Sequence, residues 1–404
     1  MRVWKGKGFA VIEQTPSLCE EIPVSFRVPA AEAPRHFHQT VKGYAVTPLV
    51  GLPALAAALG VKGIYAKDES RRFSLNAFKG LGGSYAMFRI LCDRLGLDPE
   101  STTPEELRSR ENSERIRQIE FVTCTDGNHG RGVSWAAGLF GCRAHVYMPC
   151  GTQEVRAEAI RRVGPAEVVI TELSYDDTVQ LAKQMSEQHG WILIQDTSWD
   201  GYEKIPTWII QGYLTMASET VEQMGALGVQ PTHVFLQAGV GAMAGGVLGF
   251  LADYYGERKP VAAVVEPEAA NCIYASVAAG DGKPHSVGGI AVTMMAGLNC
   301  GTPCKITWPI LRDDAEFFIS CEDAVAARGM QAYAKGLNGD PAVVSGESGA
   351  ATLGALVCIL SDTLLANVKA AMGLNAESVI LLISTEGDTD PENYQRIIQA
   401  DQPI

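Results

Sequence analysis

Short apolar segments rich in valine and isoleucine alternate along the chain with longer amphipathic segments. The short ones are "IEFVTC", "AHVYMP", "EVVITE", "WILIQD", "HVFLQA", "VAAVVE" and "SVILLIS", and their length and composition are typical of strands buried on both faces of a parallel sheet. Residues 79–95 have apolar side chains three and four positions apart, and residues 206–225 open with Pro206, so both segments are predicted helices. The alternation predicts an α/β fold.

Composition and net charge limit the kinds of molecule that the protein is expected to bind. The chain has 404 residues, of which 47% are hydrophobic, enough for one large core or two medium ones. Its 33 basic and 46 acidic residues give a net charge of −13, which repels nucleic acid and anionic membrane surfaces. No apolar run reaches the roughly 18 residues of a membrane span, and "MRVWKGKGFAVIEQ" lacks the apolar core of a signal peptide. We expect a small-molecule substrate, no nucleic acid or membrane partner, and a cytoplasmic location.

Ten cysteines are scattered along the chain without the repeated pair spacing of a zinc ribbon, so most are expected to be small buried hydrophobic residues. Cys300 and Cys304 are four positions apart, but no nearby histidine or acidic residue completes a ligand set, and no metal site is expected. A disulfide between Cys272 and Cys300 is possible, although a reducing compartment argues against it.

The glycine-rich turn "QAGVGAMAGG", residues 237–246, follows a predicted strand and precedes a predicted helix. Ligands of open parallel sheets bind at such turns, where glycines and the helix N-terminus favour an anion such as phosphate. Two alternatives remain for the turn: a tight turn without a ligand, or a dinucleotide site. The G-x-G-x-x-x-G spacing differs by one residue from the dinucleotide fingerprint, but Glu266 follows the next strand, as a ribose-binding carboxylate would.

Two further turns hold candidate reactive groups. In "SLNAFKGLGGSYA", Lys79 begins a mostly apolar helix, where a lysine is unfavourable unless it is exposed, paired or chemically used. In "TDGNHGRG", Asp126 lies in a turn between a strand and a helix, and its alternative role is that of a helix N-cap. Asp196 in "QDTSWDGY" could likewise only form a turn after a strand. His129 is interpreted as a structural residue at the helix start.

Taken together, "SLNAFKG", "TDGNHGRG", "QAGVGAMAGG" and "LLISTEGD" occur in the order expected of a fold-type II pyridoxal-phosphate enzyme, the tryptophan synthase β and threonine deaminase group. The longer motifs "KDESRRFSLNAFKGLGGSYA", "QDTSWDGYEKIPTWIIQGY", "LQAGVGAMAGG" and "SGESGA" narrow the match. Over roughly residues 44–394 the chain resembles the diaminopropionate ammonia-lyases, and these motifs are highly specific for them.

The resemblance implies two open, twisted α/β domains with pyridoxal 5'-phosphate in the cleft between them. The larger domain would comprise residues 1–89 and 226–404, and the smaller one residues 90–225. Enzymes of this group are usually homodimers.

The resemblance also assigns the residues that would contact the cofactor. Lys79 matches the lysine that forms the Schiff base, and Asn128 the residue that binds the phenolic oxygen of the ring. Ser384 matches the hydroxyl that faces the pyridine nitrogen, with Thr385 in reserve, and a neutral hydroxyl there favours elimination over transamination. The phosphate would rest on the backbone of Gly239, Val240, Gly241, Ala242 and Met243.

The implied reaction is α,β-elimination of 2,3-diaminopropionate to pyruvate and two ammonia. Lys79 would take the α-proton of the L-isomer, Asp126 would act on the D-isomer, and Asp196 would support them, with one carboxylate holding the β-ammonium. The alternatives are a threonine or serine ammonia-lyase and a cysteine synthase-like β-replacement enzyme, whose substrates have no β-ammonium. A third is a non-catalytic or nicotinamide-binding protein built on the same sheet.

Overall fold

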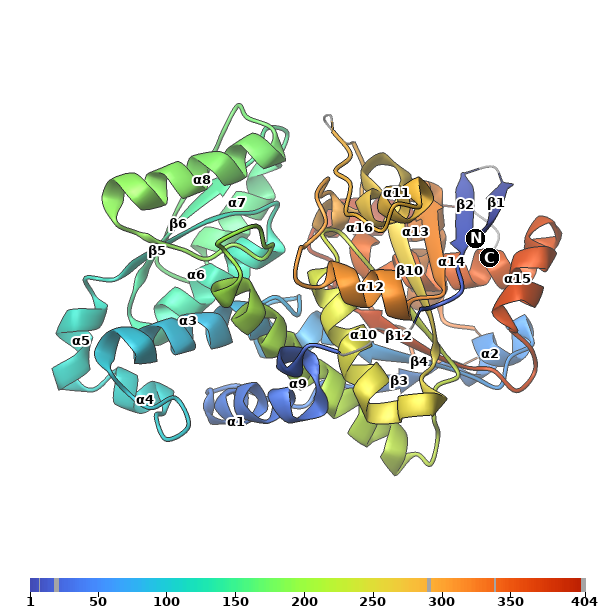
Figure 1. Cartoon of the computed structure of the whole chain (residues 1–404), viewed down its shortest axis with the longest axis horizontal. Helices are drawn as coiled ribbons and strands as arrows, with labels where there is room; N and C mark the ends of the chain where they lie inside the picture. Colours follow the sequence, from blue (N-terminus) through green and yellow to red (C-terminus); the bar gives the residue numbers. More distant parts are fainter. Residues whose placement is uncertain (7, 18–21, 289–291, 338, 401–404) are drawn as a thin grey trace. The chain divides into compact units, whose positions relative to one another are not determined.

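The computed structural model describes residues 1–6, 8–17, 22–288, 292–337 and 339–400 of the chain (Figure 1). The chain forms two compact units. The larger unit comprises Met1–Val28, Val46–Arg71 and Met216–Ile404, and the smaller one comprises Pro29–Ala45 and Arg72–Thr215. Each contains its own sheet.

The sheet of the larger unit has eight strands in the order β1-β2-β11-β10-β9-β12-β4-β3. Its middle, β11-β10-β9-β12-β4, is parallel, whereas β1, β2 and β3 run antiparallel to their neighbours. Every residue of β9, β11 and β12 is buried, as expected of a parallel sheet covered on both faces. The strands are β1 (Arg2–Gly6), β2 (Phe9–Glu13), β3 (Leu49–Gly51), β4 (Gly63–Asp68), β9 (His233–Gln237), β10 (Val261–Pro267), β11 (Phe317–Cys321) and β12 (Val379–Ser384).

The α-helices of the larger unit are the second half of α9 (Lys204–Ala226), α2 (Pro53–Leu59), α10 (Ala242–Tyr255), α11 (Cys272–Ala279), α12 (Trp308–Asp314), α13 (Asp323–Lys335), α14 (Glu347–Ser361), α15 (Ala366–Met372) and α16 (Pro391–Gln399). Among the described residues no single helix has both the length and the apolar composition needed to cross a membrane. Two consecutive segments, Glu347–Ser361 and Thr363–Met372, reach that length and composition only when they are counted together, and the chain bends by 88° between them.

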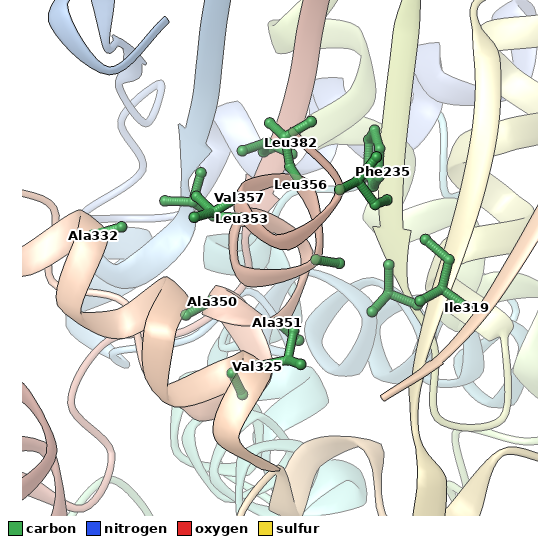
Figure 2. Close-up of a cluster of buried hydrophobic side chains, with 14 of the residues drawn as sticks. Phe235, Ile319, Val325, Ala332, Ala350, Ala351, Leu353, Leu356, Val357 and Leu382 are labelled. Atoms are coloured by element: carbon green, nitrogen blue, oxygen red, sulfur yellow. The ribbon is translucent and has the colours of Figure 1, made fainter. Parts of the chain in front are cut away.

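Helix α14 forms the centre of the core of the larger unit. Figure 2 shows its side chains Leu353, Leu356 and Val357 in one cluster with Phe235 of β9 and Leu382 of β12. Burying an aliphatic or aromatic side chain of this size stabilises the fold by roughly 1.5–3 kcal/mol.

Two glycines allow α13 and α14 to approach each other closely. A Cβ on Gly329 of α13 would lie 2.0 Å from the carbonyl oxygen of Ala350, and one on Gly354 of α14 would lie 1.9 Å from that of Val325. Any larger residue at either position would force the two helices apart.

The smaller unit is built on a parallel sheet with the order β7-β6-β5-β8. Helices α6 and α8 pack against β5 and β6. The strands are β5 (Glu120–Cys124), β6 (Arg143–Met148), β7 (Ala166–Ile170) and β8 (Ile192–Leu193), and the α-helices are α1 (Glu32–Thr40), α3 (Gly80–Leu95), α4 (Pro104–Leu107), α5 (Arg110–Ile116), α6 (Asn128–Phe140), α7 (Glu154–Arg161) and α8 (Tyr175–His189), with the first half of α9 (Lys204–Ala226).

The predicted α/β class, the parallel strands and the helices at 79–95 and 206–225 are confirmed. The units divide the chain differently from the predicted domains 1–89 plus 226–404 and 90–225. Residues 29–45 and 72–89 belong to the smaller unit, because α1 packs on α3 and α3 packs along α6. Such contacts join segments that are distant in sequence, so no motif or change of composition in the sequence marks where one unit ends and the other begins.

The start of α2 provides a test of the larger unit. Both carboxylate oxygens of Asp340 accept N–H groups there, from Ala54 and Leu55, each at 2.8 Å. Replacing Asp340 by alanine removes bonds of the helix-capping kind, so urea denaturation should show a loss of about 0.5–2 kcal/mol. Glu257→Ala, at an exposed acid of the same unit, should change stability by less than about 0.5 kcal/mol. Equal losses in the two variants would contradict this role of Asp340.

Candidate active site

Lys79 lies directly before α3, at the end of a loop with unusual backbone geometry. Phe73, Ser74 and Asn76 have φ values of 51°, 59° and 57°, and they are the non-glycine residues with positive φ in the described parts of the chain. Such left-handed residues are strained and concentrate at functional sites. Helix α6 approaches this loop closely, since a Cβ on Gly132 would lie 2.9 Å from the carbonyl carbon and oxygen of Lys79.

Lys79 forms an ion pair with Asp196. Its Nζ lies 2.5 Å from Oδ2 of Asp196, and their side chains are 18% and 10% exposed. Burial disfavours the ammonium, but Asp196, Tyr213 and Asp126 outweigh it and raise the pKa of Lys79. Nζ also lies 5.3 Å and 5.8 Å from the ring centroids of Phe78 and Tyr213, where aromatic faces stabilise a cation. Asp196 is therefore a buried charge partner rather than a turn former alone.

The carboxylate of Asp196 is held in its ionised form. Burial alone would raise its pKa, but His129, which is protonated at acid pH, and Lys79 lower it to about 2. His129 is itself neutral near pH 7, because burial lowers its pKa. The ammonium of Lys79 is therefore the group that stabilises the carboxylate.

The turn between β5 and α6 presents Asp126 and Asn128. The Oγ1 of Thr125 accepts the N–H groups of Gly127 at 2.9 Å and Gly130 at 3.0 Å, so Thr125 stabilises the first turn of α6. Asp126 is within electrostatic reach of Lys79, since its charge helps to raise the lysine pKa. Asn128 is the buried first residue of α6.

His129, predicted as a structural residue at the start of the helix, lies beside Asp196. Its Nε2 lies 2.8 Å from the carbonyl oxygen of Ile194, and because a carbonyl only accepts, Nε2 carries the proton. Nδ1 is then a lone pair, 3.8 Å from Oδ2 of Asp196, and it is buried and bonded to no group in the described part of the chain.

Sequence reasoning gave no role to Gln195 and Tyr213, although both lie in a motif that carried the resemblance. The Oε1 of Gln195 accepts from the backbone N–H of Cys124 at 2.9 Å and from Thr123 at 3.1 Å. Gln195 thereby ties the segment that holds Asp196 to the end of β5. Tyr213 packs on Phe78, with ring centroids 4.7 Å apart.

In the larger unit, the glycine-rich turn between β9 and α10 has the geometry of an anion site. The carbonyl oxygens of Gly239 and Val240 accept from Sγ of Cys272 at 3.5 Å and from N–H of Cys304 at 2.7 Å. The amide N–H groups of residues 239–243 donate to nothing among the described residues. Gly241 has φ 86°, and a Cβ there would lie 2.7 Å from Leu311. Consecutive unbonded amides before the N-terminus of a helix fit a phosphate.

Glu266 does not serve as a ribose carboxylate. It is fully buried, and its two oxygens accept the N–H groups of Ile273 at 2.8 Å and Tyr274 at 2.7 Å in the first turn of α11. Cys272 in the same turn is a thiol that donates to Gly239, not half of a disulfide. The dinucleotide alternative therefore loses the carboxylate on which it depended.

Ser384 ends β12, and Thr385 follows it. The fully buried Ser384 hydroxyl donates to Oγ of Ser345 at 2.8 Å. The hydroxyl oxygen of Thr385 accepts from Nε2 of Gln237 at 2.9 Å. The predicted site residues thus belong to two groups: Lys79, Asp126, Asn128 and Asp196 in the smaller unit, and Gly239, Val240, Gly241, Ala242, Met243, Ser384 and Thr385 in the larger one.

The fold and the anion-binding turn are those of the fold-type II pyridoxal-phosphate enzymes, and residues 41–382 match the family described as "Pyridoxal-phosphate dependent enzyme". The chain is 50% identical over 368 residues to the diaminopropionate ammonia-lyase of Escherichia coli strain K12, covering 91% of each protein. The crystal structure of the E. coli enzyme with an aminoacrylate–PLP azomethine intermediate matches with a TM-score of 0.89, and its complex with D-serine with 0.90, both at 46% identity and over 97% of each chain.

The chain therefore belongs to the diaminopropionate ammonia-lyases, as its motifs predicted. It is a carbon–nitrogen lyase whose cofactor is pyridoxal 5'-phosphate.

The buried carboxyl of Glu266 makes stability depend on pH. Burial raises its pKa from 4.5 to about 8, although the N–H groups of Ile273 and Tyr274 oppose this. Between these values the unfolded chain has released a proton that the folded protein still holds, so rising pH should destabilise the wild type relative to Glu266→Gln. Each pKa unit corresponds to about 1.4 kcal/mol. Urea midpoints of both proteins between about pH 5 and 8 check this, and a difference independent of pH would contradict it.

Proposed function

We propose that this enzyme eliminates the β-amino group of 2,3-diaminopropionate and accepts both the L- and the D-isomer. The observation that carries the proposal is the excess of negative charge around Lys79, where Asp196 lies 2.5 Å from Nζ and Asp126 adds a second negative charge. The E. coli relative, which binds D-serine in one crystal structure, supports acceptance of a D-amino acid.

Pyridoxal phosphate, when bound, withdraws electrons from the substrate's α-carbon and so makes its proton acidic. Lys79 would hold the cofactor covalently, and the free amides of residues 239–243 would hold its phosphate. Asn128 would bind the phenolic oxygen, and a hydroxyl of Ser384 or Thr385 the pyridine nitrogen.

The Lys79 amine, once released by the incoming substrate, takes the α-proton of the L-isomer. The ammonium that results is stabilised by Asp196, the same contact that raises the pKa of Lys79. Asp126 takes the α-proton of the D-isomer. The carboxylates of Asp126 and Asp196 thereby keep the moving protons close to the substrate.

Asp126 would also select the substrate by charge. The β-amino group must leave as neutral ammonia, so it is protonated as the carbon–nitrogen bond breaks, and a carboxylate stabilises that ammonium. At about 4 Å and an effective dielectric constant near 20, the attraction is worth up to ~4 kcal/mol before desolvation. The hydroxyl groups of serine and threonine are uncharged, so these substrates do not gain this attraction to Asp126. The three-carbon product that remains after the β-amino group has left is released as an imine, and water hydrolyses it to pyruvate and a second ammonia.

The proposal includes a homodimer in the cytoplasm, as is usual for relatives of this kind. Sedimentation equilibrium and cell fractionation test these two points separately from the chemistry.

The substrate assignment is tested by pyruvate release from D- and L-diaminopropionate, D- and L-serine, and L-threonine. Both isomers of diaminopropionate should give the highest kcat/KM, because only they have a β-ammonium for Asp126 and Asp196. Faster turnover of serine or threonine would favour the ammonia-lyase alternative for hydroxy amino acids.

The division of labour between the bases is tested with Asp126→Asn, which removes the charge and keeps the shape. Both isomers lose the charge contact to the β-ammonium, but the D-isomer also loses its base, so its turnover should fall by about 10²-fold or more beyond the loss seen with the L-isomer, while bound cofactor changes little. Asp176→Asn, which removes an exposed carboxylate from the first turn of α8 in the same unit, is the control and should retain both activities. Equal loss on the two isomers in Asp126→Asn would overturn the assignment.

A further inference from the structure

Gln237 ends β9 directly before the anion-binding turn, and its side chain bridges to the end of β12. It is 2% exposed. Its Nε2 donates to the carbonyl oxygen of Ile383 and to Oγ1 of Thr385, each at 2.9 Å. Its Oε1 is buried and bonded to no group in the described part of the chain.

The carbonyl of Ile383 fixes the orientation of this amide. Turned the other way, Gln237 would place Oε1 against that carbonyl, and two acceptors would face each other. Nε2 must therefore face Ile383 and Thr385. The fold keeps this orientation although it leaves Oε1 without a donor, which indicates that both Nε2 bonds are needed.

The hydrogen bond from Gln237 to Thr385 also determines whether Ser384 or Thr385 has a hydroxyl proton available for the cofactor. Because Thr385 accepts from Gln237, its single hydroxyl proton remains available, and no described group accepts it. Ser384 gives its proton to Ser345 at 2.8 Å. A pyridine nitrogen that is not protonated can only accept a hydrogen bond, so its partner must be a hydroxyl that donates.

We propose that Gln237 is a positioning residue that holds the hydroxyl of Thr385 as a donor to the pyridine nitrogen of the cofactor, with Ser384 anchored to Ser345. This inference rests on the cofactor of the proposed function and reverses the order of Ser384 and Thr385 expected from the sequence. Gln237 thereby joins the strand that carries the phosphate-binding turn to the residue that binds the ring.

The test is the ¹⁵N NMR resonance of the holoenzyme loaded with pyridoxal phosphate labelled at the pyridine nitrogen. This resonance reports the hydrogen bond to the nitrogen, whereas packing alone leaves it unchanged. Thr385→Val should move it toward the position of a nitrogen without a hydrogen bond, and Thr385→Ser should restore the wild-type position. Ser384→Ala should leave it close to that of the wild type.

Gln237→Glu is the decisive variant, because a carboxylate cannot donate to Thr385 and instead accepts its proton. Its resonance should shift in the same direction as that of Thr385→Val, whereas Gln237→Met, which neither donates nor accepts strongly, should shift less. A shift in Ser384→Ala without one in Thr385→Val, or a wild-type resonance in Gln237→Glu, would overturn the inference. Turnover of diaminopropionate by the wild type is measured separately, so a failed substrate proposal is distinguished from a failed Gln237 assignment.

Discussion

The ion pair between Lys79 and Asp196 is the interaction on which the candidate active site depends. Without a partner, desolvation would favour the neutral form of the partly buried Lys79, and the buried carboxylate of Asp196 would favour its protonated form. Each keeps the other ionised. The close approach of α6 through Gly132 and the bond from Gln195 to the end of β5 bring the two side chains together from segments more than a hundred residues apart. The geometry that stabilises the pair therefore also fixes the position of the Lys79 amine in the candidate site.

Much of the fold could be predicted because hydrophobic periodicity is a local property. The segments "HVFLQA" and "SVILLIS" became β9 and β12, and the helices at 79–95 and 206–225 lie within a few residues of their predicted ends. The segment "WILIQD" contributed only Ile192–Leu193, since it forms the edge of a four-stranded sheet and pairs briefly with β5. The order of the motifs along the chain was enough to predict the family, which the comparisons confirm. The roles of the individual site residues remain predictions.

What the sequence could not decide was the choice between residues of equal chemistry. Thr125 and Asp126 are both good acceptors for the first turn of a helix, and the bonds of Thr125 to Gly127 and Gly130 follow from the three-dimensional path of the turn. Glu266 was expected to follow its strand as a ribose-binding carboxylate would, but it lies within β10, and α11 folds back so that its first amides use both oxygens. In both cases the deciding contact is set by the fold and not by residue type or spacing.

The order of strands in the larger sheet has a consequence for synthesis on the ribosome. β12 lies between β9 and β4 in the sheet and is the last strand among the described residues, so the sheet cannot close until residues 379–384 have emerged. The smaller unit is complete in sequence at residue 215. Until residues 379–384 have emerged, β4 and β9 expose the strand edges that β12 covers in the folded sheet, and in this interval the nascent chain is vulnerable to aggregation.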